Sequence, residues 1–138
     1  MATIRPIVVP FAAVIINIVL LSIGNAAGFF DGVTASSTGE PVTNIAIAFA
    51  TLFAVAALYL LGTLMNRFPG GVRGRRLFLF ISGVVLVLSF GTPLTGLDDS
   101  TSEAIIILQL AHIVTVAGGV IAARPTEPFE DATSPSVG

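Results

Sequence analysis

Residues 103–120 read EAIIILQLAHIVTVAGGV, and this stretch decides the fold class. Together with its flanks it forms an uncharged, mainly apolar run from 104 to 123. A helix rises about 1.5 Å per residue, so such a run covers about 30 Å, the thickness of the hydrocarbon core of a bilayer. The stretch therefore predicts a membrane-spanning helix. It also holds His112, the only histidine of the chain, one turn after Gln109.

The whole chain has the composition of an integral membrane protein. Of its 138 residues, 54% are hydrophobic and 10% are charged, and the mean hydropathy is +0.99. Soluble domains carry about 25% charged residues. The absence of cysteine excludes disulfides, thiol catalysis, iron–sulfur clusters and thiolate zinc sites. A net charge of −2 without any lysine gives no reason to expect a nucleic-acid partner.

Four apolar stretches have the length of a membrane span, at about 7–28, 43–66, 77–97 and 104–123. All charged residues (six Arg, eight Asp or Glu) lie outside them. This exclusion is expected of spans, because a charge at the bilayer centre costs at least about 2.5–3.5 kcal/mol. We therefore predict an all-α, four-helix transmembrane bundle, up-down-up-down, over residues 1–124. The acidic stretch 125–138, which contains Pro and Ser, is predicted to be a disordered cytoplasmic tail.

The arginines predict the orientation of the bundle. They precede the first span, connect the second to the third, or follow the fourth: Arg5, Arg67, Arg73, Arg75, Arg76 and Arg124. The other two loops, 29–42 and 98–103, are polar, with acidic residues and no Lys or Arg. By the positive-inside rule both termini are cytoplasmic, in a multi-pass protein of the prokaryotic inner (plasma) membrane. A cleaved signal peptide is the alternative for the first span, but its length and the charge pattern favour a retained helix.

Small residues recur along the spans, as helix association in lipid requires, because lipid tails are as apolar as leucine. The first span carries a G-x-x-x-G spacing, and the second carries six alanines together with Thr51. We expect the following residues to take part in helix packing: Gly24, Gly28, Gly118, Gly119 and Pro93.

A few uncharged polar side chains lie near the middle of the predicted spans. By counting along the helices, Asn17 and His112 share the central layer, where we expect them to pair, and Ser89 and Gln109 lie about 3–6 Å toward the outside. Pro93 lacks an N–H, so the carbonyl of Ser89 needs another donor, and we expect Gln109 to supply it. The sequence thus predicts a ligand-binding or polar core made of Asn17, Ser89, Gln109 and His112.

His112 has three interpretations. A neutral, hydrogen-bonded imidazole would position the helices; alternatively it relays protons or contacts a transported solute, or it ligates haem iron or copper. No carboxylate lies in a span, which disfavours ion coupling, and Ser89 and His112 lack the acidic third member of a hydrolase triad. No cofactor or metal site is predicted, except haem at His112 under the third interpretation.

The arginines between the second and third spans have two interpretations. They either set the topology alone or also bind anionic lipid head groups, through Arg67, Arg73, Arg75 and Arg76. The sequence has no phosphate-binding glycine loop, catalytic triad or metal-ligand cluster. We expect a non-enzymatic membrane protein that acts by helix association, as a homo-oligomer or as an accessory subunit of a membrane partner. Binding or transport of a small solute through the polar layer is the alternative.

Two stretches resemble elements of a known family. LVLSFGTPL (86–94) is similar to an LSLxGPL element, and LQLAHIVTVAGGVIAARP (108–125) is similar to an L-x-L-M-H-L-x-V-A-x-x-x-I-P element. Both occur in a family of small four-span bacterial membrane proteins known only as a domain of unknown function. The resemblance carries over Ser89, Pro93 and His112 by position. It implies the four-span layout and brings no established activity.

Overall fold

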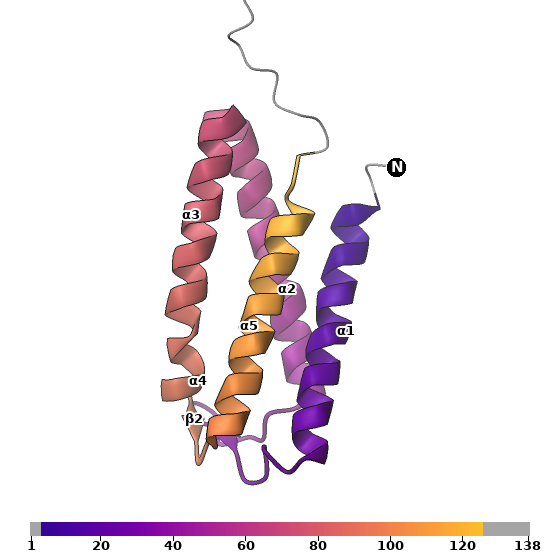
Figure 1. Cartoon of the computed structure of the whole chain (residues 1–138), viewed down its shortest axis with the longest axis vertical. Coiled ribbons are helices and arrows are strands. Elements are labelled where there is room, and N and C mark those ends of the chain that lie inside the picture. Colours follow the sequence, from indigo (N-terminus) through magenta and orange to yellow (C-terminus); the bar gives the residue numbers. More distant parts are fainter. Residues whose placement is uncertain (1–3, 126–138) are drawn as a thin grey trace, which may run out of the picture.

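The computed structural model describes residues 4–125, except for the side chain of Pro69, and shows a bundle of antiparallel helices (Figure 1). The bundle helices are α1 (Arg5–Ala26), α2 (Asn44–Met65), α3 (Gly71–Ser89), α4 (Gly91–Thr95) and α5 (Ser102–Ala122). A π-helical turn, η1 (Asn66–Gly70), joins α2 to α3 at one end. Strands β1 (Thr34–Ala35) and β2 (Leu97–Asp98) pair antiparallel at the other end.

Four helical segments are long and apolar enough to cross a membrane: Arg5–Ala26, Asn44–Phe68, Gly71–Thr95 and Ser102–Ala122. They confirm the all-α, four-helix fold predicted from the sequence, and the chain is a multi-pass membrane protein. The third segment begins at Gly71 rather than at 77. The sequence prediction started after the last arginine, but the arginines at 73, 75 and 76 belong to the first turns of α3. The predicted tail lies outside the described residues, apart from Pro125.

The four long helices do not pack equally. α1, α2 and α5 form a three-helix core, in which α5 packs most extensively against α1. α3 lies to one side of this core and makes fewer contacts with α2 and α5 (Figure 1). In its most apolar window only 17% of the residues are buried, against 28% in α1 and in α5. The value for α2 is 22%. α3 is therefore the least covered of the four long helices.

The α1–α2 connection folds into a cap over one end of the core, where the sequence indicates only a polar loop. Phe30 and Val33 are buried there and pack with Leu21 of α1 and Leu108 of α5. The β1–β2 pairing ties this cap to the segment before α5, and the hydroxyl of Ser36 donates to the Asp98 carboxylate at 2.9 Å. The cap thus fixes how α1, α2 and α5 meet at this end.

The α2–α3 hairpin is tight at the opposite end. The π turn is broken at Phe68, whose backbone is extended (φ −140°, ψ 110°), and Gly70 and Gly71 follow with positive φ angles of 77° and 55°. One turn into α3, Gly74 approaches the carbonyl of Met65 so closely that a Cβ would lie 1.9 Å from that oxygen. Glycine is therefore required here for the two helices to reverse direction within five residues.

Candidate functional site

The main polar contact inside the bundle is made by Asn17 of α1. Its side chain is 1% exposed. The amide nitrogen Nδ2 donates to the hydroxyl of Thr51 on α2 at 2.9 Å and to the hydroxyl of Thr115 on α5 at 3.0 Å. The carbonyl oxygen of Ala111 on α5 lies 3.3 Å from the same nitrogen. One side chain therefore connects all three helices of the core. We call Asn17, Thr51 and Thr115 the amide node.

Small residues bring the helix backbones close enough for the amide node to form. A Cβ added to Gly118 would lie 3.1 Å from the Cβ of Ala13 on α1, and one added to Gly119 would lie 2.5 Å from the Cβ of Leu58 on α2. The glycine pair of α5 thus allows close approach to both neighbours at once. In lipid such packing and interhelical hydrogen bonds replace the hydrophobic effect as the source of helix association.

The amide node is not the pairing that the sequence suggests, because Asn17 does not bond to His112. The Nδ1 atom of His112 lies 2.6 Å from the carbonyl oxygen of Leu108, one turn earlier in α5. A carbonyl only accepts, so this contact requires the proton on Nδ1. Asn17 instead reaches Ala111 and Thr115, which lie on the neighbouring face of the same helix.

Ser89 and Gln109 also lie apart from the amide node. α3 ends at Ser89, whose hydroxyl donates to the carbonyl of Leu86 at 2.8 Å, and α4 begins two residues later around the buried Pro93. Gln109 is half-buried, and its side chain has no hydrogen bond to the Ser89 carbonyl within the described residues. The expected pair between Gln109 and the carbonyl of Ser89 is thus not formed. The four predicted residues therefore do not converge on one site.

The sequence did not predict that Thr51 and Thr115 accept hydrogen bonds from Asn17. Thr51 stands out only as part of the alanine-rich face of the second span, and Thr115 has no special spacing of its own. A usable signal existed for Thr115, since it lies four residues after Ala111 and three before Gly118, both of which are buried. A hydroxyl residue on a small-residue face can receive a hydrogen bond from a neighbouring helix.

The two glycines of the G-x-x-x-G spacing have different roles. Gly24 is buried, and a Cβ there would lie 2.5 Å from the ring of Phe30 and 2.7 Å from the side chain of Ile107. Gly28 lies beyond the end of α1 with φ +76°, where the amide of Phe29 closes the helix by donating to the carbonyl of Gly24. Gly24 is therefore a packing position, and Gly28 is a helix-terminating position.

Positive charge collects at the end of the bundle opposite the cap. Arg5 at the start of α1 donates a hydrogen bond to the backbone carbonyl of Arg124, just beyond α5. The guanidinium of Arg75 lies 5.5 Å from the ring centre of the fully buried Phe78, which packs with Ala123 next to Arg124. Of the other arginines, Arg67 lies over Phe68, at 5.8 Å, and Arg73 and Arg76 are exposed on α3.

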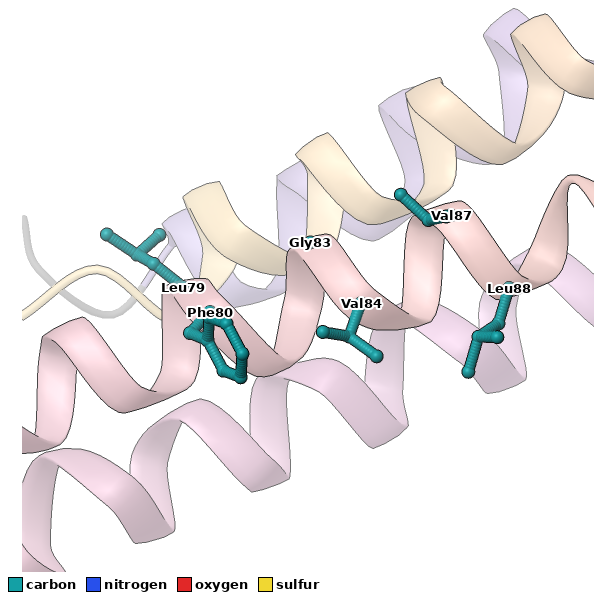
Figure 2. Close-up of a pocket in the computed structure, with 6 residues that line it drawn as sticks. All are labelled: Leu79, Phe80, Gly83, Val84, Val87 and Leu88. Atoms are coloured by element: carbon teal, nitrogen blue, oxygen red, sulfur yellow. The ribbon is translucent and has the colours of Figure 1, made fainter.

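The outer face of α3 carries a shallow apolar hollow of about 440 Å³. All of its lining residues come from this one helix, and each is exposed (Figure 2): Leu79, Phe80, Gly83, Val84, Val87 and Leu88. Gly83 forms its floor, since a Cβ added there would meet nothing within 4 Å. We call this surface the α3 hollow.

The sequence of the chain matches a known protein family. The family described as "Family of unknown function (DUF6069)" matches residues 2–127, which include all four membrane-crossing segments. The chain belongs to DUF6069. This assignment confirms the resemblance seen in the sequence. No curated protein and no solved structure matches the chain.

For this DUF6069 chain, the described part therefore offers three distinct surfaces or contacts. They are the amide node inside the core, the arginines at one end and the α3 hollow on the side. Between residues 4 and 125 no three His, Asp or Glu side chains gather in a way that would hold a metal ion.

Proposed function

We propose that the chain is a non-enzymatic membrane protein that acts by helix association, as a homodimer formed through the α3 hollow. The supporting observation is the uneven packing of the bundle. α3 has most of its surface uncovered, and its outer face offers a cavity over Gly83 beside side chains that project from the same face. Val87 and Leu88, for example, are 71% and 72% exposed.

A second copy of this chain is the occupant that fits this surface. A two-fold interface brings the same patch of both subunits together, so the patch must carry both the projecting side chain and the cavity that receives it. The α3 hollow has both within two helical turns, with Gly83 next to Val84 and Val87. It contains no charged residue, so two copies can meet in lipid without burying charge.

The proposed membrane is the prokaryotic inner membrane, with both termini in the cytoplasm. The support is the segregation of charge along the described chain. All six arginines lie at or near the end that contains the helix-terminal residues 5 and 124, and the five carboxylates of residues 4–125 lie near the cap. Cytoplasmic loops are the ones that carry excess arginine.

Transport through the polar layer has less support from the geometry. The amide nitrogen of Asn17 is already bonded to two hydroxyl groups, and the side chain is almost fully covered. A solute would have to separate α1, α2 and α5, where glycine and alanine bring the backbones closest. Haem ligation by the Nε2 atom of His112 is tested directly by the absorption spectrum of the purified protein, which would then show an intense Soret band.

Disulfide crosslinking tests the dimer. The chain has no cysteine, so Val87→Cys introduces the only thiol. Ile15→Cys on the outer face of α1 is the matched control, since Ile15 is 61% exposed and also lies in the middle of its helix. Oxidation in native membranes should give a covalent dimer with Val87→Cys and little with Ile15→Cys, because a disulfide needs Cα atoms within about 7 Å.

A second variant tests whether the cavity itself matters. Gly83→Leu fills the α3 hollow without a clash inside its own chain, because nothing lies within 4 Å of its Cβ position. It should reduce the crosslinking of Val87→Cys while leaving the thermal stability of the monomer unchanged. Equal crosslinking at positions 15 and 87, or crosslinking that Gly83→Leu does not alter, would show that α3 faces only lipid.

A further inference from the structure

The arginine end of the bundle contains an arrangement that helix association does not explain. Arg5 lies at the start of α1, Arg75 in the first turns of α3, and Arg124 just beyond the end of α5. They are far apart in the sequence, but Arg5 donates to the carbonyl of Arg124, and Phe78, which contacts the guanidinium of Arg75, packs with Ala123 beside Arg124. We call these three residues the arginine triad.

No carboxylate within residues 4–125 compensates this charge. The five acidic residues of that range are at 31, 40, 98, 99 and 103, in the cap and its connections at the other end of the bundle. The Nε atom of Arg5 and the Nη1 atom of Arg75 are buried without an acceptor. Three like charges brought together in this way repel one another, and a buried donor of a charged group without a partner is unfavourable.

The surroundings hold the triad in place. The ring of Phe78 supports the guanidinium of Arg75, and the carbonyl of Arg124 accepts a hydrogen bond from Arg5. Asn66, from the turn after α2, donates to the carbonyl of Ala123 at 2.9 Å and so fixes the end of α5 beside Arg124. Arg5 and Asn66 thus bond to the last backbone carbonyls after α5. Neither bond uses the guanidinium group of Arg75 or Arg124, so both groups can bind a ligand.

We propose that the arginine triad binds one phosphate group, and that the group belongs to the head group of an anionic phospholipid. Guanidinium groups bind phosphate oxygens through paired, charge-assisted hydrogen bonds, which are stronger than neutral ones. The triad lies at the ends of three membrane-crossing helices, at the level where phospholipid head groups lie. One phosphate there supplies the negative charge that the described residues lack at this end.

This site differs from a general attraction of the α2–α3 turn for acidic lipid. Arg67, Arg73 and Arg76 all belong to the turn after α2 and the first turns of α3, whereas the triad combines residues from the start of α1, from α3 and from the segment just after α5. Removing one triad charge should therefore weaken binding more than removing the charge of Arg76, which lies next to Arg75 in the sequence.

A titration of the full chain in detergent tests the proposal. The ligands are dihexanoyl phosphatidylglycerol, dihexanoyl phosphatidylcholine and inorganic phosphate, each titrated at about 0.15 M salt so that the diffuse field is screened. Arg75→Gln and Arg124→Gln should each raise the Kd for phosphatidylglycerol about tenfold, and Arg76→Gln no more than about threefold. Arg124→Gln keeps the backbone carbonyl that Arg5 needs, so its fold is preserved.

The ligand series identifies the source of the phosphate. Tight binding of phosphatidylglycerol and weak binding of inorganic phosphate would identify the ligand as a lipid head group. If inorganic phosphate binds more tightly, and Arg75→Gln and Arg124→Gln still lose more affinity than Arg76→Gln, the triad is the site but its ligand is free phosphate. Equal losses in Arg75→Gln and Arg76→Gln, or equal affinity for the two lipids, would overturn the proposal. So would binding that appears only after Glu127, Glu130 and Asp131 are neutralised, since the chain's own carboxylates would then be the ligand.

Discussion

The side-chain nitrogen of Asn17 on α1 lies 2.9 Å from the hydroxyl oxygen of Thr51 on α2, and this contact joins the two helices in the middle of the membrane-crossing segments. In water such a bond competes with solvent. Between helices in lipid the alternative for the amide is an unpaired polar group in hydrocarbon. The contact is therefore expected to contribute both to stability and to the rotational setting of the two helices.

A double-mutant cycle measures this contact. Asn17→Ala and Thr51→Val should each lower the free energy of unfolding in detergent, and their coupling energy should be about 0.6–1.7 kcal/mol. Asn17→Ala should cost more than Thr51→Val, because it also removes the bond to Thr115. Thr63→Val serves as the control, since Thr63 is exposed near the end of α2 and its hydroxyl donates to the carbonyl of Tyr59 in the same helix. A coupling energy of zero would mean that the two residues do not interact.

The glycine pair of α5 gives a prediction about packing. Gly119→Ala places a Cβ 2.5 Å from the Cβ of Leu58, so α2 and α5 must separate, and we expect a loss of about 1–3 kcal/mol of stability. Gly83→Ala in α3 meets no atom within 4 Å. It should be neutral or should stabilise the helix by up to about 1 kcal/mol. Gly119→Ala should therefore melt at a lower temperature than the wild type and Gly83→Ala should not, and similar melting temperatures of the two variants would contradict the close approach at Gly119.

Thr101 gives a prediction about the start of α5. Its hydroxyl accepts the amide of Ala104 at 3.1 Å and donates to the carbonyl of Phe29 at 3.0 Å, so it both caps α5 and ties it to the end of α1. The sequence also has the S-x-x-E spacing of a capping box at Ser100–Glu103, but the residue that caps α5 is Thr101, one position later.

Thr101→Ala should lower stability by about 1 kcal/mol, as the loss of a helix cap generally does. Thr101→Ser keeps the hydroxyl and should retain most of it. Hydrogen exchange of the first amides of α5 measures the effect locally. Unchanged exchange in Thr101→Ala would rule out this capping role.

Thiol labelling tests the orientation. Ser37→Cys lies in the cap and Arg73→Cys lies near the α2–α3 turn, and both positions are exposed. A maleimide that cannot cross membranes should label Ser37→Cys in intact cells and Arg73→Cys only after lysis, because the arginine-bearing loop is expected in the cytoplasm. Labelling in the opposite order would reverse the proposed topology.

The fold class and the four spans could be predicted because they depend on quantities that add along the chain. An uncharged run of the right length identifies a span whatever its neighbours are. The end of α3 at Ser89 was not predicted, since residues 77–97 read as one span. The cap could not be predicted in the same way. β1 and β2 have two residues each and pair across more than 60 positions, so neither has a periodic pattern to detect.

The internal contacts were harder to predict because they depend on the order and rotation of the helices. Counting placed Asn17 at the right depth, and it is indeed a buried polar residue of the core. Depth alone does not distinguish His112 from Thr115, which lies one turn away on a different face of α5. Nor does the sequence say that α3 packs less closely than the other helices, and that uneven packing leaves Ser89 outside the node.

The position of α5 in the chain also determines how the bundle can be assembled. A ribosome delivers the spans in order, so α3 reaches the membrane before α5, although α1 packs most extensively with α5, and α2 packs more with α5 than with α3. Until the fourth span arrives, Asn17 has Thr51 but neither Thr115 nor the carbonyl of Ala111. The last helix to be synthesised therefore completes the core, and a chain interrupted before it would expose a polar amide to lipid, which is a feature that membrane proteases and chaperones can recognise.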